Sequence, residues 1–121
     1  MMFTEENKNL LLEALSYIKR FNDKIVVIKY GGAAMIDEQL KHSFAQDIVL
    51  LQSLGMLPVI VHGGGPEVSK AMEQLGQEVS FIDGLRVTSS ENLKVAEMVL
   101  SGTINKEIIT HLNTFGGKAV G

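Results

Sequence analysis

Apolar residues follow two different spacings along the chain, and each spacing predicts one kind of element. Residues 25–28 and 59–61 are uninterrupted apolar runs with no polar alternation, which is typical of central parallel strands covered on both faces. Apolar residues at intervals of three and four predict helices over residues 37–54, with Asp37 as N-cap, and over residues 66–75. The order strand, helix, strand, helix predicts an α/β fold with right-handed crossovers.

The next part of the sequence departs from this plan. Residues 79–82 and 85–88 are short apolar runs on either side of Asp83-Gly84, a dipeptide that favours a tight turn, so we expect a hairpin here. Arg86 lies in the second run. It is either an exposed residue on the wet face of the hairpin or a guanidinium held rigidly for bidentate recognition of a carboxylate, and the local pattern leaves both readings open.

Two further helices are expected after the hairpin. The segment Thr88-Ser89-Ser90-Glu91 has capping-box spacing, which predicts a helix from there to about Leu100. After a break at Ser101-Gly102, Thr103 is expected to cap a second helix that ends at Gly116-Gly117.

The amino-terminal segment predicts one more helix, over residues 4–21. Thr4 is a candidate N-cap, and Glu5 and Glu6 lie in the first turn, where acids suit the helix dipole. The apolar surface of this helix is wider than a helix lying on one domain usually needs. It comprises Leu10, Leu11, Leu12, Ala14, Leu15, Tyr17, Ile18 and Phe21. The helix is therefore either an arm that packs on another subunit or an ordinary amphipathic helix that covers its own sheet.

Each predicted parallel strand ends in a glycine turn, and a lone cation precedes the first turn. Lys29 lies at the carboxyl end of the first strand, just before Tyr30, Gly31 and Gly32. The second strand runs into His62-Gly63-Gly64-Gly65-Pro66, with the proline in the first turn of a helix. Ligands of open α/β sheets bind at the carboxyl edge of the strands, where glycines let bare N–H groups approach an anion. We therefore expect both turns to form one shared anion site, with phosphate as the obvious candidate.

Composition and charge exclude several classes of function. The chain has 121 residues, 45% of them hydrophobic, which is one domain at most with a real core. A net charge of −3 and the lack of a basic stripe argue against nucleic acid as the main partner. With zero cysteines, disulfides and thiolate metal sites are excluded, and no metal site is expected. No apolar segment has the length of a membrane span and the amino terminus lacks the cations of a signal peptide, so we expect a soluble, cytoplasmic protein without a membrane partner.

Three segments together resemble the amino acid kinase family. They are Lys29-Tyr30-Gly31-Gly32, His62-Gly63-Gly64-Gly65-Pro66 and Asp83-Gly84-Leu85-Arg86-Val87-Thr88. The resemblance covers the chain from about Leu10 onward, and it is most specific to the members that act on N-acetyl-L-glutamate. It implies a three-layer αβα sandwich with a mostly parallel sheet, of which this chain is the amino-terminal half plus an extra amino-terminal helix.

The resemblance also implies a reaction and a role for each candidate site residue. The reaction transfers the γ-phosphoryl group of ATP, with Mg2+, to the side-chain carboxylate of N-acetyl-L-glutamate, which gives an acyl phosphate in arginine biosynthesis. Lys29 matches the lysine that stabilises the transferring phosphoryl group, in agreement with the charge that develops on its oxygens. The N–H groups that contact phosphoryl oxygens belong to Gly31, Gly32 and Gly64. Gly64 and Gly65 line the acetylglutamate pocket, and Arg86 matches the arginine that binds the α-carboxylate of the substrate.

The amino-terminal helix has a counterpart in the family as well. Members inhibited by arginine carry such a helix, which interlaces dimers into a hexamer, and an aromatic residue near their arginine site matches Tyr17. The resemblance therefore favours the interface reading and implies a homo-oligomer. It divides the chain into an interface helix over residues 1–22 and a substrate-binding lobe over residues 23–121.

The largest departure from the family is length. Residues 118–121 read as the start of another core strand, and the carboxyl-terminal half of the family, with its nucleotide site, is not in these 121 residues. The chain is therefore expected to stop before the nucleotide-binding lobe and to lack appreciable kinase activity alone. Two other readings stay open: a sister kinase acting on another N-blocked amino acid, such as an aminoadipate, and a non-catalytic oligomerising fragment whose glycine loops are only turns.

Overall fold

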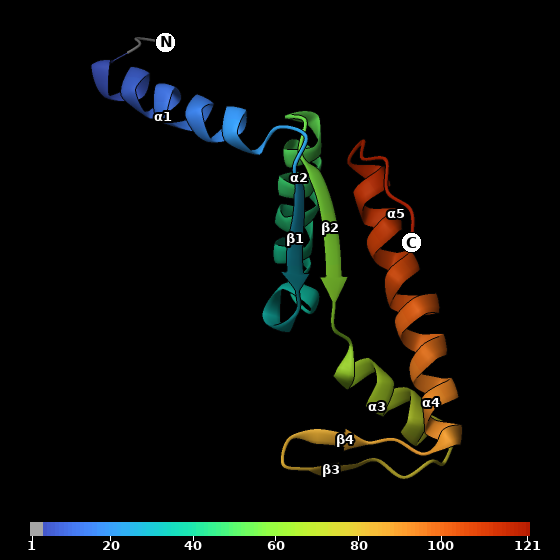
Figure 1. Ribbon diagram of the computed structural model, residues 1–121. Coiled ribbons are helices and arrows are strands. Elements are labelled where there is room, and N and C mark those ends of the chain that lie inside the picture. Colours follow the sequence, from blue (N-terminus) through green and yellow to red (C-terminus); the bar gives the residue numbers. More distant parts are fainter. Residues whose placement is uncertain (1–3) are drawn as a thin grey trace.

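Two parallel strands form the centre of the structure (Figure 1). The computed structural model describes residues 4–121. Strand β1 (Ile25–Tyr30) pairs with β2 (Leu57–His62) in a register that places Ile25 opposite Leu57 and Tyr30 opposite His62. Helix α2 (Glu38–Ser53) connects the two strands, so the predicted strand–helix–strand unit is confirmed.

The other described elements extend this unit in both directions along the chain. In chain order they are helix α1 (Glu5–Phe21), the 3-10 helix η1 (Gly32–Met35), helix α3 (Gly65–Gln74), strands β3 (Ser80–Ile82) and β4 (Leu85–Val87), helix α4 (Ser90–Glu97), the π-helix η2 (Met98–Ile104) and helix α5 (Asn105–Thr114). The antiparallel hairpin of β3 and β4 is confirmed. Asp83 and Gly84 turn between its strands with φ of 50° and 78°, the left-handed pair that a tight hairpin turn needs. The α/β class with parallel strands is also confirmed.

Two hydrophobic clusters hold the helices in place. In the first, α2 and α5 pack on one face of the strands, where the buried residues Ala45, Ile48 and Leu112 contact Ile28 and Ile60. In the second cluster, α3 packs on α4. Its buried residues are Val68, Met72 and Val95. Figure 1 shows α5 running alongside the strands, whereas α3, α4 and the hairpin lie beyond the carboxyl ends of the strands.

The opposite face of the two strands is not covered by the described residues. Ile25 and Val27 on β1 are 70% and 67% exposed, and Val59 and Val61 on β2 are exposed as well. The prediction that both faces are covered is therefore wrong for residues 4–121. Because α2 and α5 lie on the same side, they shield only every second residue of each strand. Of the three predicted layers, the described residues build the sheet and one helical layer.

Side-chain caps fix where α2 and α4 begin. Asp37 Oδ1 accepts a hydrogen bond from Leu40 N at 3.0 Å, as predicted. At α4 the cap is Ser89, whose Oγ accepts from Asn92 N at 3.1 Å. The helix thus begins one residue later than the predicted cap at Thr88, because the serine hydroxyl next to it takes the capping position.

The predicted break at Ser101-Gly102 is wrong, because α4, η2 and α5 form one continuous helix. Thr103 is accordingly not an N-cap. A π-turn contains an extra residue, so it rotates the face that the helix presents after it. Val95, before the π-turn, packs on α3, whereas Leu112, after it, packs on α2. Packing on two neighbours therefore overrides the weak local helix propensity of this segment.

The strand predicted over residues 118–121 does not form. Lys118 N donates to Gln52 Oε1 at 3.1 Å, and Ala119 N donates to Asn113 Oδ1 at 2.8 Å. Side chains of α2 and α5 thus take the backbone donors that a strand would direct to a neighbouring strand.

Helix α1 points away from the rest of the described chain (Figure 1). Thr4 caps it, as predicted, through a hydrogen bond that Thr4 Oγ1 accepts from Asn7 N at 3.2 Å. No residue of α1 is buried, and Leu10 is 67% exposed. The reading of α1 as a cover for its own sheet is therefore wrong. Among the elements of residues 4–121, none is a helix both long and apolar enough to cross a bilayer.

Candidate functional site

Both glycine turns lie at the carboxyl edge of the two strands, as the parallel register requires. Gly63 N donates to Tyr30 O at 3.0 Å, which joins the start of the second turn to the end of β1. Gly32 opens η1 with φ of +61°, a left-handed conformation that favours glycine. The expectation that the two turns meet at one edge is confirmed.

Close packing against the π-helix holds the second turn. Gly64 is buried and has φ of +151°, a conformation that side chains rarely allow. A methyl group at this position would overlap the side chains of Leu100 and Ile104, both in η2. Gly65 then begins α3, with Pro66 next to it. The free N–H groups and the positive dipole end of α3 lie at this edge of the sheet, which suits an anion.

Arg86 reaches from the hairpin to the start of α3. Its Nη2 donates to Gly65 O and to Ser69 Oγ, both at 2.8 Å, and its Nη1 lies 3.7 Å from Met72 Sδ. The guanidinium carbon is 4.8 Å from the ring centre of Phe81, the residue directly across the hairpin. The reading of Arg86 as an exposed residue on the wet face is therefore wrong, because the side chain is half-buried and held by these four neighbours.

This guanidinium is a cation without an acidic partner in the described part of the chain. The ion pairs between residues 4 and 121 include neither Arg86 nor Lys29. The oxygen acceptors Gly65 O and Ser69 Oγ account for two of the five N–H donors of an arginine. The donors that are left and the net positive charge suit a carboxylate ligand.

Lys29 lies at the same strand end but on the other face of the sheet from the helices. Side chains alternate along β1, so Lys29 shares the uncovered face with Val27, and Tyr30 points to the helical side. The ammonium group is exposed and precedes Gly31 by two positions. The structure thus brings Lys29, both glycine turns and Arg86 to one end of the strands.

The residues that hold Arg86 were missed in the sequence. Ser69 follows Gly65 by four positions, which is one turn of α3, and Phe81 is the cross-strand neighbour of Arg86. The hairpin register was a signal that could have found Phe81, because cross-strand neighbours contact one another, whereas no local pattern links Ser69 to Arg86.

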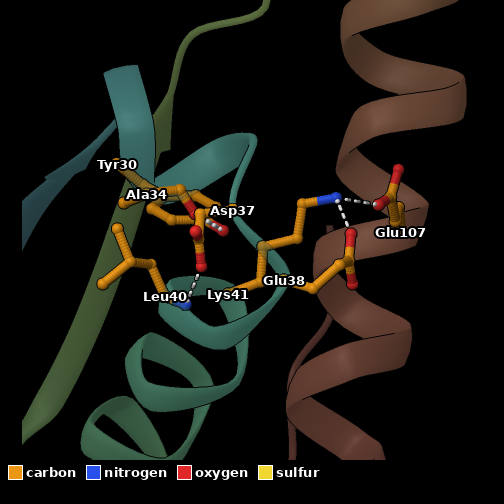
Figure 2. Close-up of polar contacts among 7 residues, drawn as sticks. All are labelled: Tyr30, Ala34, Asp37, Glu38, Leu40, Lys41 and Glu107. Atoms are coloured by element: carbon orange, nitrogen blue, oxygen red, sulfur yellow. Dashed lines mark hydrogen bonds and ion pairs between the residues drawn. The ribbon is translucent and has the colours of Figure 1, made fainter.

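A charged cluster between α2 and α5 lies beside the first turn (Figure 2). Lys41 Nζ is 2.9 Å from Glu38 Oε1 and 3.2 Å from Glu107 Oε1. The hydrogen bond from Lys41 lowers the pKa of Glu38, and the same bond raises the pKa of Lys41. Two members of the cluster, Lys41 and Glu107, line a cavity of about 90 Å³ together with Tyr30 and Phe44. Helical spacing relates Glu38 to Lys41, but no sequence pattern pointed to Glu107.

Tyr17 is not brought to this site. It is 52% exposed on α1, which points away from the strands. No group of three or more histidine, cysteine or acidic residues in the described range is arranged to hold a metal ion.

Comparison with known proteins identifies relatives. A family model described as the amino acid kinase family matches residues 24–121. The chain is 57% identical over 116 residues to the acetylglutamate kinase of Methanocaldococcus jannaschii, a match that covers 96% of this chain and 39% of that protein. It is 54% identical over 113 residues to the acetylglutamate kinase of Vesicomyosocius okutanii subsp. Calyptogena okutanii, covering 93% of this chain and 37% of that one. The chain thus spans about two fifths of the length of these curated relatives.

Two solved structures have a similar fold. The smu.665 protein from Streptococcus mutans superposes with a TM-score of 0.68 and 37% sequence identity, over 78% of this chain and 37% of that one. The N-acetylglutamate synthase from Neisseria gonorrhoeae, complexed with coenzyme A and N-acetyl-glutamate, superposes with a TM-score of 0.71 and 25% identity, over 91% of this chain and 26% of that one.

Proposed function

The chain belongs to the amino acid kinase family, and we propose that it is the substrate-binding portion of an acetylglutamate kinase. The enzyme transfers the γ-phosphoryl group of ATP to the side-chain carboxylate of N-acetyl-L-glutamate and gives an acyl phosphate for arginine biosynthesis. One structural observation supports the proposal independently of the names of the relatives. Arg86, a cation without an acidic partner among the described residues, is anchored beside the second of two glycine turns that meet at one sheet edge.

Glycines of both turns and Lys29 act on the transferred group. Backbone N–H groups of Gly31, Gly32 and Gly64 bind phosphoryl oxygens, and the Lys29 ammonium stabilises the charge on these oxygens in the transition state. The acceptor carboxylate is ionised at neutral pH, so it attacks the γ-phosphorus without a general base. Its oxygen forms the new bond to phosphorus while the bond from phosphorus to the bridging oxygen breaks and ADP leaves.

Arg86 acts at the other end of the substrate, where it binds the α-carboxylate. Gly65 O and Ser69 Oγ take both N–H groups of Nη2, so the carboxylate binds to the N–H groups on Nε and Nη1 and to the positive charge of the guanidinium. Because Gly65 O and Ser69 Oγ already hold the side chain, little conformational entropy is left to lose when the ligand binds. The backbone of Gly64 and Gly65 lines the same pocket at the positive end of α3.

The partners follow from the same proposal. ATP is the co-substrate, and Mg2+ accompanies the nucleotide. Residues 1–22 form an interface arm in a homo-oligomer, a hexamer in the arginine-sensitive form, with Tyr17 exposed on the arm. The enzyme is cytoplasmic and has neither a nucleic-acid nor a membrane partner. Sedimentation of the chain with and without residues 1–22 tests the arm, since loss of the arm is expected to reduce the oligomer.

Calorimetric titration with N-acetyl-L-glutamate tests the proposal. We compare the parent chain with Arg86→Ala and with Arg20→Ala, which removes the other arginine of the sequence from the exposed surface of α1. The parent is expected to bind, Arg86→Ala to bind about tenfold more weakly or worse, and Arg20→Ala to bind like the parent.

A second ligand separates the proposal from its nearest alternative. N-acetyl-aminoadipate has one more methylene group and is expected to bind about 10–200-fold more weakly. Equal or tighter binding of this ligand would assign the chain to a sister kinase. Absence of N-acetyl-L-glutamate binding by a chain shown to be folded would contradict the proposed pocket.

A further inference from the structure

Tyr30 is a buried residue between the lysine and the glycines of the first turn. It is 5% exposed, and its ring stacks on Phe44 of α2 with 3.9 Å between ring centres and 9° between ring planes. Its hydroxyl donates to Ala34 O at 2.8 Å, a contact drawn in Figure 2. Burial raises the pKa of the phenol above its ordinary value of 10.0, so the hydroxyl keeps its proton and acts as a donor at neutral pH.

The same residue contacts both glycine turns. Its hydroxyl bonds across the first turn to Ala34, the third residue of η1, and its backbone oxygen accepts from Gly63 N of the second turn at 3.0 Å. In the sequence, Gly31 and Gly32 lie between Tyr30 and Ala34, the two residues that this hydrogen bond joins. Apart from their chain neighbours, no residue in the described range 4–121 has an atom within 4 Å of where a Cβ of either glycine would lie, so side-chain packing does not fix their backbone.

We propose that Tyr30 is a positioning residue that holds the N–H groups of Gly31 and Gly32 in their anion-binding arrangement. Glycine has the largest backbone freedom, and a turn with two glycines and no packing around them needs an anchor at its far end. The hydrogen bond to Ala34 O supplies that anchor, and the stacked ring holds the hydroxyl in place. The inference rests on the proposed function, because it deepens the role given there to the first turn.

The supporting side of Tyr30 is itself braced. Phe44, on which the ring stacks, is one helical turn after Lys41, and Lys41 pairs with Glu107 of α5 at 3.2 Å. The tyrosine therefore rests on a part of α2 that is tied to α5, rather than on a mobile loop. We therefore expect a change at the hydroxyl to affect the turn without loss of the fold.

Tyr30→Phe tests the inference, with Tyr17→Phe as the matched control. Phenylalanine keeps the ring and its stacking but removes the donor to Ala34 O, whereas Tyr17 carries the other tyrosine hydroxyl of the chain on exposed α1. In the ¹⁵N-labelled 121-residue chain, NMR follows two quantities: hydrogen exchange of the amides of residues 32–34, and the shift of the Gly32 amide during titration with inorganic phosphate. Exchange of β2 amides reports whether the fold is intact.

In Tyr30→Phe we expect exchange at residues 32–34 to become about fivefold faster and phosphate to bind about fivefold more weakly at Gly32, with β2 amides unchanged. Tyr17→Phe is expected to match the parent in both. Equal phosphate binding by Tyr30→Phe and the parent would overturn the inference, and so would a parent whose Gly32 amide does not respond to phosphate. A parent that binds phosphate at Gly32 but not N-acetyl-L-glutamate would instead contradict the proposed substrate, and the Tyr30 comparison would still decide the positioning role.

Discussion

The two glycine turns follow the same plan in sequence, but the structure supports them in different ways. Space around the first turn is open, and a hydrogen bond from Tyr30 to Ala34 O spans it. The second turn is crowded at Gly64, which lies against Ile104 of the π-helix and adopts φ of +151°. The comparison teaches that the fold itself fixes the second turn, whereas the first has room for a group that arrives and leaves, such as a transferred phosphoryl group.

The largest difference in stability is expected when one methyl group is added to the second turn and, for comparison, to the first. Gly64→Ala forces a side chain into a strained backbone conformation and into Ile104, so we expect the free energy of unfolding to fall by about 3 kcal/mol or more. Gly31→Ala is the matched control, because Gly31 has extended backbone and open space, and its stability is expected to stay within about 1 kcal/mol of the parent. Urea denaturation followed by circular dichroism measures both. Equal losses in the two variants would refute the contrast between the turns.

A smaller effect is expected when Arg86 becomes lysine. In arginine, Nη2 donates to Gly65 O and Ser69 Oγ while Nε and Nη1 stay available for a carboxylate. The single ammonium nitrogen of lysine cannot take both places at once. The dissociation constant for N-acetyl-L-glutamate is expected to rise about tenfold, with little change in stability. If Arg86→Lys binds like the parent, charge alone is sufficient and the held geometry is unimportant.

The support of Arg86 can be weakened without touching its charge. Ser69→Ala removes one of the two oxygen acceptors at 2.8 Å, and we expect about a fivefold loss of N-acetyl-L-glutamate affinity. Ser53→Ala is the control, because the Ser53 hydroxyl donates to Leu50 O within its own helix. Calorimetry on the two variants measures the difference, and a loss that is the same in both would show that Ser69 does not orient the guanidinium.

The smallest expected effect concerns the charged cluster beside the first turn, tested with Lys41→Met. The pKa of Glu38 lies below its ordinary value of 4.5, so its contribution to stability is lost as pH falls through that lowered pKa. The pKa of Lys41 lies above 10.5, so its contribution is lost as pH rises through the raised value. Between these limits the parent is expected to be slightly more stable than Lys41→Met, because the two carboxylate partners are largely exposed and solvent screens the ion pairs. Urea denaturation across the pH range tests this, and a difference that does not shrink at the two extremes would contradict it.

Short-range patterns were sufficient to predict much of the fold and the meeting of the two turns. The apolar runs, the cap at Asp37 and the Asp83-Gly84 turn act within a few residues, and each is confirmed. Family membership, which was inferred from the glycine turns and the segment around Arg86, is confirmed by the match over residues 24–121.

Features that depend on packing between distant elements could not be predicted in the same way. Ser101-Gly102 reads locally as a break, but Leu100 and Ile104 pack beside Gly64 and the helix continues through a π-turn. The orientation of the Arg86 side chain could not be predicted for the same reason. The register of a hairpin does not say which other element packs against it. The partners of Arg86 lie on α3, 17 to 21 positions earlier in the chain.

The most direct test of one shared site is a crystal structure of the chain with N-acetyl-L-glutamate bound. Our account predicts that the α-carboxylate lies on the Arg86 guanidinium, and that the side-chain carboxylate points to the gap between Gly32 and Gly64. A ligand bound with its carboxylates reversed, or bound away from the carboxyl edge of β1 and β2, would contradict the account.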